Sequence, residues 1–253
     1  MIKSIIKLSA FLIALFIFGC GSSGALSTKT SNRNYYSMHT RPDQLFEKTV
    51  PSVVRLISTD QKYYGAGVII NSEGVILTSG HIANNSKKWW VSFFNPEKQI
   101  GRKNLTIEYL EASVIEIDKK RDLSLLKVKS DGVFNPMKLG ETADLKVGQK
   151  VFSIAHPAKQ YFSFLEGRIS RLIDDYEWVY SSDKKFIFKK NESFKANVIQ
   201  IQMPENEGNS GGPIIDNRGR LIAINTLAIK KGQSLSYAVQ IDEIKKFLND
   251  AGY

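Results

Sequence analysis

The sequence predicts an all-β protein, and three observations lead to that prediction. Short runs rich in Val, Ile, Tyr and Phe fill the middle of the chain. Gly, Asn, Asp and Pro separate these runs, as they do in antiparallel sheets that close into barrels. Helical patterns occur only near the two ends of this region. The chain has a single cysteine, so disulfides cannot brace the fold.

The β-rich runs fall into two groups along the chain. We expect the first group of strands at residues 53–58, 64–70, 89–94, 105–117 and 123–128, with one more apolar run at 74–77. We expect the second group at residues 150–155, 162–173, 196–203, 213–215, 221–228 and 235–239. Basic residues at 184–185 and 189–190 lie in a long insert between the second and third runs of this group, which we interpret as a solvated hairpin rather than a lipid- or acid-binding patch.

Two short helices should bracket the strands. Residues 42–48 begin with Pro42, which suits the first turn of a helix because its missing N–H needs no partner there. Residues 241–248 place apolar side chains on one helical face. The members of that face are Ile241, Ile244, Phe247 and Leu248.

The sequence Gly-Asn-Ser-Gly-Gly-Pro at residues 208–213 is the strongest functional signal. A serine hydroxyl is a weak nucleophile until a base takes its proton and backbone N–H groups hold the resulting oxyanion. The glycines beside Ser210 permit a tight turn that aims the N–H groups of Gly208 and Ser210 at one point, with the N–H of Asn209 nearby. The pattern predicts a nucleophilic serine, provided that a base and an orienting acid exist elsewhere.

The chain has three histidines as candidate bases. His81 follows the apolar run 74–77 and is the favoured base, since it lies just past a predicted strand. His156, at a strand end before Pro157, is the rival. His39 lies in a polar stretch.

Two aspartates compete for the role of the orienting acid. Asp122 precedes the apolar strand 123–128, where an acid is readily buried and can hold an imidazole in one tautomer. Asp118 lies four residues earlier. We favour Asp122, although a solvated turn is the commoner place for an aspartate.

These motifs, in the order His81, Asp122, Ser210, resemble the chymotrypsin-like serine proteases, and more closely the HtrA (Deg) branch. Residues 64–78, 140–151 and 212–226 match further HtrA-type segments in order, so the resemblance runs from about residue 43 to the end of the chain.

The resemblance implies two six-stranded antiparallel barrels, at about residues 42–135 and 136–253, that together form a protease domain at 42–253. His81 would be the base, Asp122 the orienting acid and Ser210 the nucleophile. Gly208, Asn209 and Ser210 would line the oxyanion hole. No metal or cofactor is needed, and the chain ends after the last predicted helix, so we expect no PDZ domain.

The resemblance also implies where substrate binds. Asn225, Thr226 and Leu227 would contact the polypeptide substrate. Glu205 lies near the expected base of the primary specificity pocket, where it could favour a basic side chain or turn out to solvent. Glu207 replaces the usual proline or arginine, and His156 stands where the family often has asparagine.

The N-terminus predicts export and lipidation. Lys3 and Lys7 precede an apolar run at residues 8–18, which is a signal peptide pattern too short to span a bilayer comfortably. The run ends before Gly19-Cys20, which resembles the lipobox of bacterial lipoproteins, and the alternatives are an ordinary secretory signal or an uncleaved anchor. We therefore expect residues 1–20 to be a lipoprotein signal, Cys20 to carry acyl chains, and the protein to be anchored in the bacterial cell envelope.

Residues 21–41 are rich in Ser, Thr, Asn and Gly, and predict a flexible linker between the membrane and the protease domain. Tyr35 and Tyr36 interrupt it. In HtrA proteins an aromatic N-terminal segment packs between the subunits of a trimer, so a homotrimer is one expectation and a local aromatic cluster is the other. The net charge of +10 comes with no pattern typical of a nucleic-acid-binding module.

Overall fold

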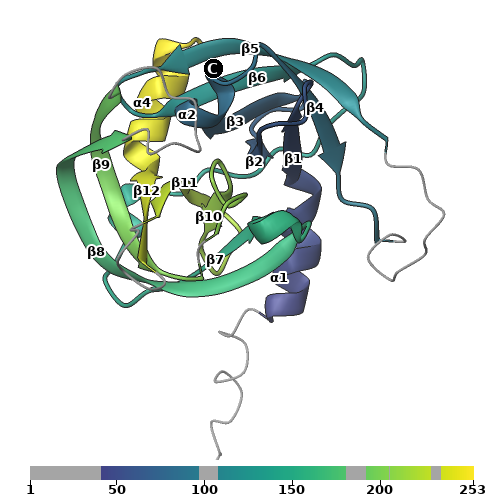
Figure 1. Ribbon diagram of the computed structural model, residues 1–253. Coiled ribbons are helices and arrows are strands. Elements are labelled where there is room, and N and C mark those ends of the chain that lie inside the picture. Colours follow the sequence, from purple (N-terminus) through teal and green to yellow (C-terminus); the bar gives the residue numbers. More distant parts are fainter. Residues whose placement is uncertain (1–40, 97–107, 181–191, 205, 229–234) are drawn as a thin grey trace, which may run out of the picture. The chain divides into compact units, whose positions relative to one another are not determined.

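Two closed antiparallel barrels of six strands each make up the described part of the chain, as the sequence predicts (Figure 1). The computed structural model describes residues 41–96, 108–180, 192–204, 206–228 and 235–253. These residues belong to a unit that begins at His39. Among them, no helix is long and apolar enough to cross a membrane.

The first barrel has the strand order β1-β2-β3-β6-β5-β4 and closes through pairing of β1 with β4. Its strands are β1 (Val53–Ser58), β2 (Tyr64–Ile69), β3 (Val75–Ser79), β4 (Lys88–Phe93), β5 (Leu110–Asp118) and β6 (Leu123–Val128). The β5 strand starts later than the expected residue 105, and residues 97–107 lie outside the described residues.

The second barrel has the strand order β10-β11-β12-β9-β8-β7 and closes through pairing of β10 with β7. Its strands are β7 (Lys150–Ala155), β8 (Ser163–Tyr180), β9 (Glu192–Gln202), β10 (Pro213–Ile215), β11 (Leu221–Ala228) and β12 (Leu235–Gln240). The β8 and β9 strands extend well into the stretch that the sequence assigns to an insert, because Tyr176 to Tyr180 keep pairing with Ala196 to Glu192.

Helices α1 (Pro42–Thr49) and α4 (Ile241–Asp250) lie where the sequence predicts them. In α4 the predicted apolar face, Ile241, Ile244, Phe247 and Leu248, is buried. A four-residue helix, α2 (Gly80–Ala83), follows β3 and was not predicted, because four residues leave no periodic signal.

One hydrophobic cluster joins the two barrels. It combines buried residues of the first barrel, such as Leu77 and Leu125, with buried residues of the second, such as Ile154, Ile224 and Val239. Each barrel also has its own interior cluster. The shared cluster fixes how the barrels face each other, and therefore how loops from one barrel meet loops from the other.

Candidate active site

His81 lies in α2, directly after β3, and the backbone there is held against Asp122. The N–H of Gly80 donates to the Asp122 carbonyl at 2.8 Å. A Cβ at Gly80 would lie 3.2 Å from the Asp122 backbone carbon and from its Oδ1, so a glycine eases this close approach. Asp122 itself has φ of 57°, a left-handed conformation that aspartate tolerates better than most residues.

The Asp122 carboxylate binds His81 twice. Its Oδ1 accepts the backbone N–H of His81 at 2.7 Å, and its Oδ2 lies 2.8 Å from His81 Nδ1. Asp122 is fully buried and His81 is 6% exposed. A carboxylate oxygen only accepts hydrogen bonds, so the neutral imidazole carries its proton on Nδ1 and Nε2 is its basic nitrogen. The favoured pairing of His81 with Asp122 is present in the fold.

Thr226 contributes a third contact to this pair from the other barrel. Its hydroxyl donates to Oδ2 of Asp122. Thr226 is 2% exposed and lies in β11, at a register shift between Asn225 and Leu227 that adds one residue to the strand. The sequence places Thr226 among the substrate contacts, and in the structure its side chain is directed to the buried acid.

The turn that carries Ser210 is fixed against the first barrel. The Ser210 carbonyl accepts the N–H of Ala66 at 2.9 Å, and a Cβ at Gly65 would lie 3.0 Å from that carbonyl oxygen. At Gly211 a Cβ would overlap Thr78 Oγ1, and φ is +79°. Thr78 is only three residues before His81 in the chain. The segment that packs against the serine turn therefore also carries the histidine.

The backbone on the N-terminal side of Ser210 is equally constrained. Gly208 has φ of +101°, and a Cβ there would overlap the His156 carbonyl oxygen. The Glu207 carbonyl accepts the N–H of Ala158 at 2.9 Å, and the Gly208 carbonyl accepts the N–H of His156 at 3.2 Å. In a trans peptide the N–H points away from the carbonyl, so the Gly208 N–H faces away from Ala158.

The N–H of Asn209 does not serve the oxyanion hole as the sequence suggests. It donates to the carbonyl of Asn206 at 3.2 Å, and the Asn209 side chain donates to the carbonyl of Pro204 at 3.2 Å. Both groups are therefore bonded to the backbone of Pro204 and Asn206. This leaves the N–H groups of Gly208 and Ser210 as the candidate oxyanion donors.

His156, the rival base, has a structural role. It is fully buried, its Nε2 lies 3.2 Å from the Val54 carbonyl, and its Nδ1 accepts the N–H of Phe162 at 3.0 Å. Burial lowers its pKa to about 3, and the nearby charge of Arg55 opposes protonation as well. The ring therefore stays neutral and links the second barrel to β1 of the first.

Asp118, the rival acid, is committed to its own turn. It accepts hydrogen bonds from the N–H groups of Lys120 and Arg121 at 2.8 and 2.9 Å and from the Arg121 guanidinium at 2.6 Å.

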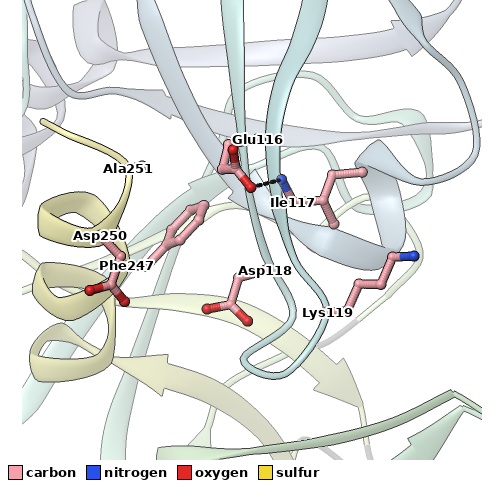
Figure 2. A pocket seen from close by; sticks show the side chains of 7 residues that line it. All are labelled: Glu116, Ile117, Asp118, Lys119, Phe247, Asp250 and Ala251. Carbon is pink, nitrogen blue, oxygen red and sulfur yellow. Dashed lines mark hydrogen bonds between the residues drawn. The ribbon is translucent and has the colours of Figure 1, made fainter.

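Beside this turn lies a cavity of about 450 Å³, shown in Figure 2. The residues that line it are Glu116, Ile117, Asp118, Lys119, Phe247, Asp250 and Ala251. His81, Asp122 and Ser210 are not among its lining residues.

Some predicted sites cannot be compared with the structure. Glu205, the signal with Cys20, the linker residues Tyr35 and Tyr36, and the basic residues at 184–185 and 189–190 of the insert lie outside the described residues. Asn225 acts through its backbone, since its carbonyl accepts Gly211 N–H at 2.8 Å and its N–H donates to the Gly212 carbonyl at 2.9 Å. For Leu227 the structure describes only the backbone pairing with Tyr237.

Within the described residues no group of three or more His, Cys, Asp or Glu side chains is arranged to hold a metal ion.

A buried His–Asp pair from one barrel, together with a glycine-rich serine turn from the other that packs against Thr78, matches the parts of the two-barrel serine peptidases. The chain belongs to the trypsin-like peptidase family, because residues 65–224 match the family model described as "Trypsin-like peptidase domain". The matched segment contains His81, Asp122 and Ser210.

The curated relatives are serine proteases of the HtrA type. The chain is 29% identical to rat serine protease HTR4, in an alignment that covers 91% of this chain. It is 32% identical to mouse serine protease HTRA4, in an alignment that covers 81% of this chain. It spans only 44% and 39% of those relatives, respectively.

Solved structures show the same fold. The Rv3671c protease in its inactive form has a TM-score of 0.63 at 21% identity, with 83% of this chain and 93% of that one covered. Deg5 has a TM-score of 0.61 at 26% identity, with 81% and 90% covered.

Proposed function

We propose that this protein is a serine endopeptidase in which Ser210 attacks the peptide carbonyl. The observation that supports this most directly is the buried chain of hydrogen bonds from Thr226 to Asp122 to His81, beside a glycine-rich serine turn held by the first barrel. Asp122 keeps the imidazole in the tautomer whose Nε2 accepts a proton, which is what an activated serine needs.

The reaction proceeds by acyl transfer. His81 takes the proton of Ser210 as the hydroxyl oxygen attacks, and the N–H groups of Gly208 and Ser210 hold the oxyanion. His81 then protonates the leaving amine, and water attacks the acyl-enzyme with His81 again as base. Asp122 stabilises the imidazolium in both steps. None of these steps calls for a metal or an organic cofactor.

The backbone around Gly208 favours an active enzyme over a latent one. A collapsed hole would turn the Glu207 carbonyl toward the space that the oxyanion needs. Here that carbonyl is bonded to Ala158 N–H at 2.9 Å, which directs the Gly208 N–H the opposite way. Ala158 adopts φ of 48° and ψ of 35° to make this bond, and such strain commonly occurs at functional sites.

The proposed substrates are unfolded or exported polypeptides, and the proposed location is the bacterial cell envelope. Support comes from the signal-like residues 1–20, from Cys20 as an acylation site, and from the HtrA-type relatives. Radiolabelled palmitate incorporation into the full chain, compared with Cys20→Ala, tests the anchor. Equal labelling of both chains would remove the lipoprotein proposal without affecting the peptidase proposal.

The test of the enzyme compares the wild type with Ser210→Ala, using a fluorophosphonate probe and an unfolded casein. Ser130→Ala is a matched control, since its hydroxyl serves only an exposed turn, where it accepts Gly132 N–H at 3.1 Å. We expect labelling and cleavage in the wild type and in Ser130→Ala, and neither in Ser210→Ala.

Two other outcomes are informative. Labelling without casein cleavage would mean a competent nucleophile with a restricted substrate range. No labelling of the wild type would contradict the proposal and favour a latent or chaperone-like binding domain, which is the alternative function for this fold.

A further inference from the structure

Two exposed tyrosines lie on one buried arginine. Among the described residues, Tyr109, Tyr161 and Tyr253 are the tyrosines with large exposed fractions, at 40%, 49% and 51%. The guanidinium carbon of Arg55 lies 3.9 Å from the ring centre of Tyr161 and 5.6 Å from that of Tyr109. Tyr109 and Tyr161 therefore form one continuous surface, although they come from different barrels.

Arg55 has no acidic partner in this arrangement. It is 3% exposed, and none of the ion pairs within the described ranges includes it. Its Nη2 donates to the Tyr109 hydroxyl at 2.6 Å, while its Nε is buried with no hydrogen-bond partner. A buried cation usually pairs with a carboxylate, and here two aromatic faces take that place. The arginine holds both rings in position while they remain open to solvent.

This surface continues to the oxyanion turn through Tyr64. The Tyr64 hydroxyl donates to Glu207 Oε2 at 3.3 Å, and its Cε2 would lie 3.0 Å from a Cβ at Gly208. Burial is the main cause that raises the pKa of Tyr64. The Glu207 carboxylate raises that pKa further, and the neighbouring Tyr161 adds a smaller contribution. The Lys159 ammonium lies 5.6 Å from the centre of the Tyr64 ring. We call Tyr64, Tyr161 and Tyr109 the tyrosine surface.

The position of the tyrosine surface decides which half of a substrate it meets. The serine turn is bonded to β11 on one side, through Gly211 and Asn225, and to β2 on the other, through Ser210 and Ala66. Under the proposed function, the acyl half of the substrate lies along β11. The tyrosine surface belongs to the opposite wall, made of the start of β2 and the loop after β7.

We propose that the tyrosine surface binds the polypeptide on the leaving-group side of the scissile bond, over several residues. This inference rests on the proposed endopeptidase function. Tyrosines that are already fixed in place lose little conformational entropy on binding, and they offer apolar faces and hydroxyl groups to an extended chain. The surface would therefore favour unfolded polypeptides with apolar or aromatic residues after the cleavage point.

The experiment measures how much the leaving-group half contributes. Two peptides share one acyl half, and the first ends one residue after the scissile bond whereas the second continues for six residues that include Leu and Phe. The readout is the ratio of kcat/KM for the long peptide to that for the short one. We expect Tyr161→Ala and Tyr109→Ala each to lower this ratio by about three- to tenfold, as the loss of one aromatic contact implies.

Tyr253→Ala is the matched control, because Tyr253 is equally exposed but lies after α4, outside the tyrosine surface. It should keep the wild-type ratio. Melting temperatures of all three variants show whether each is folded. An unchanged ratio in folded Tyr161→Ala and Tyr109→Ala would overturn the proposal while leaving the endopeptidase function intact.

A binding measurement separates this proposal from the failure of catalysis. In the Ser210→Ala background, the long peptide carrying a fluorophore on its acyl end should bind more tightly than the short one by anisotropy, and Tyr161→Ala should remove most of that difference. If the wild type cleaves neither peptide, the proposed function fails, and this binding difference alone decides whether the tyrosine surface engages polypeptide.

Discussion

The hydroxyl of Thr226 donates to the same Asp122 oxygen that faces His81 Nδ1. The acid and the base come from the first barrel, and the threonine comes from β11 of the second. A buried carboxylate needs several donors to stay ionised away from water, and Thr226 supplies one of them across the interface between the barrels. The packing of one barrel on the other therefore contributes directly to the hydrogen bonds of the proposed catalytic pair.

Replacing Thr226 tests this contact. Thr226→Val keeps the shape but removes the donor, so we expect kcat/KM to fall by about tenfold or more, since a hydrogen bond to a charged group is worth roughly 1.5–3 kcal/mol. Thr226→Ser keeps the hydroxyl and should recover most of the activity. Peptide hydrolysis rates measure both variants. Equal rates for the valine and serine variants would show that the hydroxyl does not matter to the pair.

Gly208→Ala tests the oxyanion turn. An added Cβ would overlap the His156 carbonyl oxygen, and φ of +101° is unfavourable for alanine. The turn must move, which displaces the Gly208 N–H, and the loss of one oxyanion donor typically costs about 10²–10³ in kcat. Gly148→Ala is a suitable control, because Gly148 also has positive φ, at +83°, but has open space around it. A fully active Gly208→Ala would contradict the assigned donor.

His156 should make the fold sensitive to acid. The folded-state pKa is about 3, below the ordinary value of 6.5, so between these values the unfolded chain binds a proton that the folded chain does not. The free energy of unfolding should therefore fall as the pH drops from about 6.5 toward 3, by roughly 1.4 kcal/mol per pH unit from this residue.

His156→Asn isolates that contribution, because asparagine does not titrate. Urea unfolding at several pH values gives the difference in unfolding free energy between wild type and variant. We expect the unfolding free energy of the wild type to decrease steadily, relative to that of His156→Asn, as the pH falls below 6.5. A difference that stays constant with pH would mean that His156 becomes protonated in the folded protein.

Arg121 links the turn before Asp122 to the C-terminal helix. Its guanidinium bonds to Asp118 at 2.6 Å and to Glu243 of α4 at 2.8 Å, with all three side chains under 20% exposed. Arg121→Met should destabilise the fold by about 3 kcal/mol, because it removes the cation shared by two largely buried carboxylates and leaves Glu243 with Lys246 alone and Asp118 with backbone N–H groups alone. Thermal unfolding measures the loss, and Lys245→Met, which breaks the exposed pair with Glu141, should change stability by less than about 1 kcal/mol.

Much of the barrel architecture could be predicted because its signals are local. Alternating apolar residues and turn residues mark most of the strands. The motifs that contain His81, Asp122 and Ser210 can also be recognised in the sequence, in that order. The glycines at 208 and 211 could also be anticipated, since a tight turn beside a nucleophile requires positive φ. The four-residue α2 helix was missed, because it is too short to leave a periodic pattern. The stretch between residues 173 and 196 was interpreted as a hairpin, but the extension of β8 and β9 into it was not included in the expected strand bounds.

The sequence by itself determined the fold class and the set of candidate groups, because side-chain chemistry and short-range patterning are properties of neighbouring residues. The tertiary structure decided which candidates meet. It placed Asp122 rather than Asp118 against His81, buried His156 as a neutral link to Val54, and directed the Thr226 hydroxyl to the acid. It also brought Tyr109 and Tyr161 to Arg55. These outcomes depend on residues far apart in the chain, and only the packing of the two barrels sets their distances.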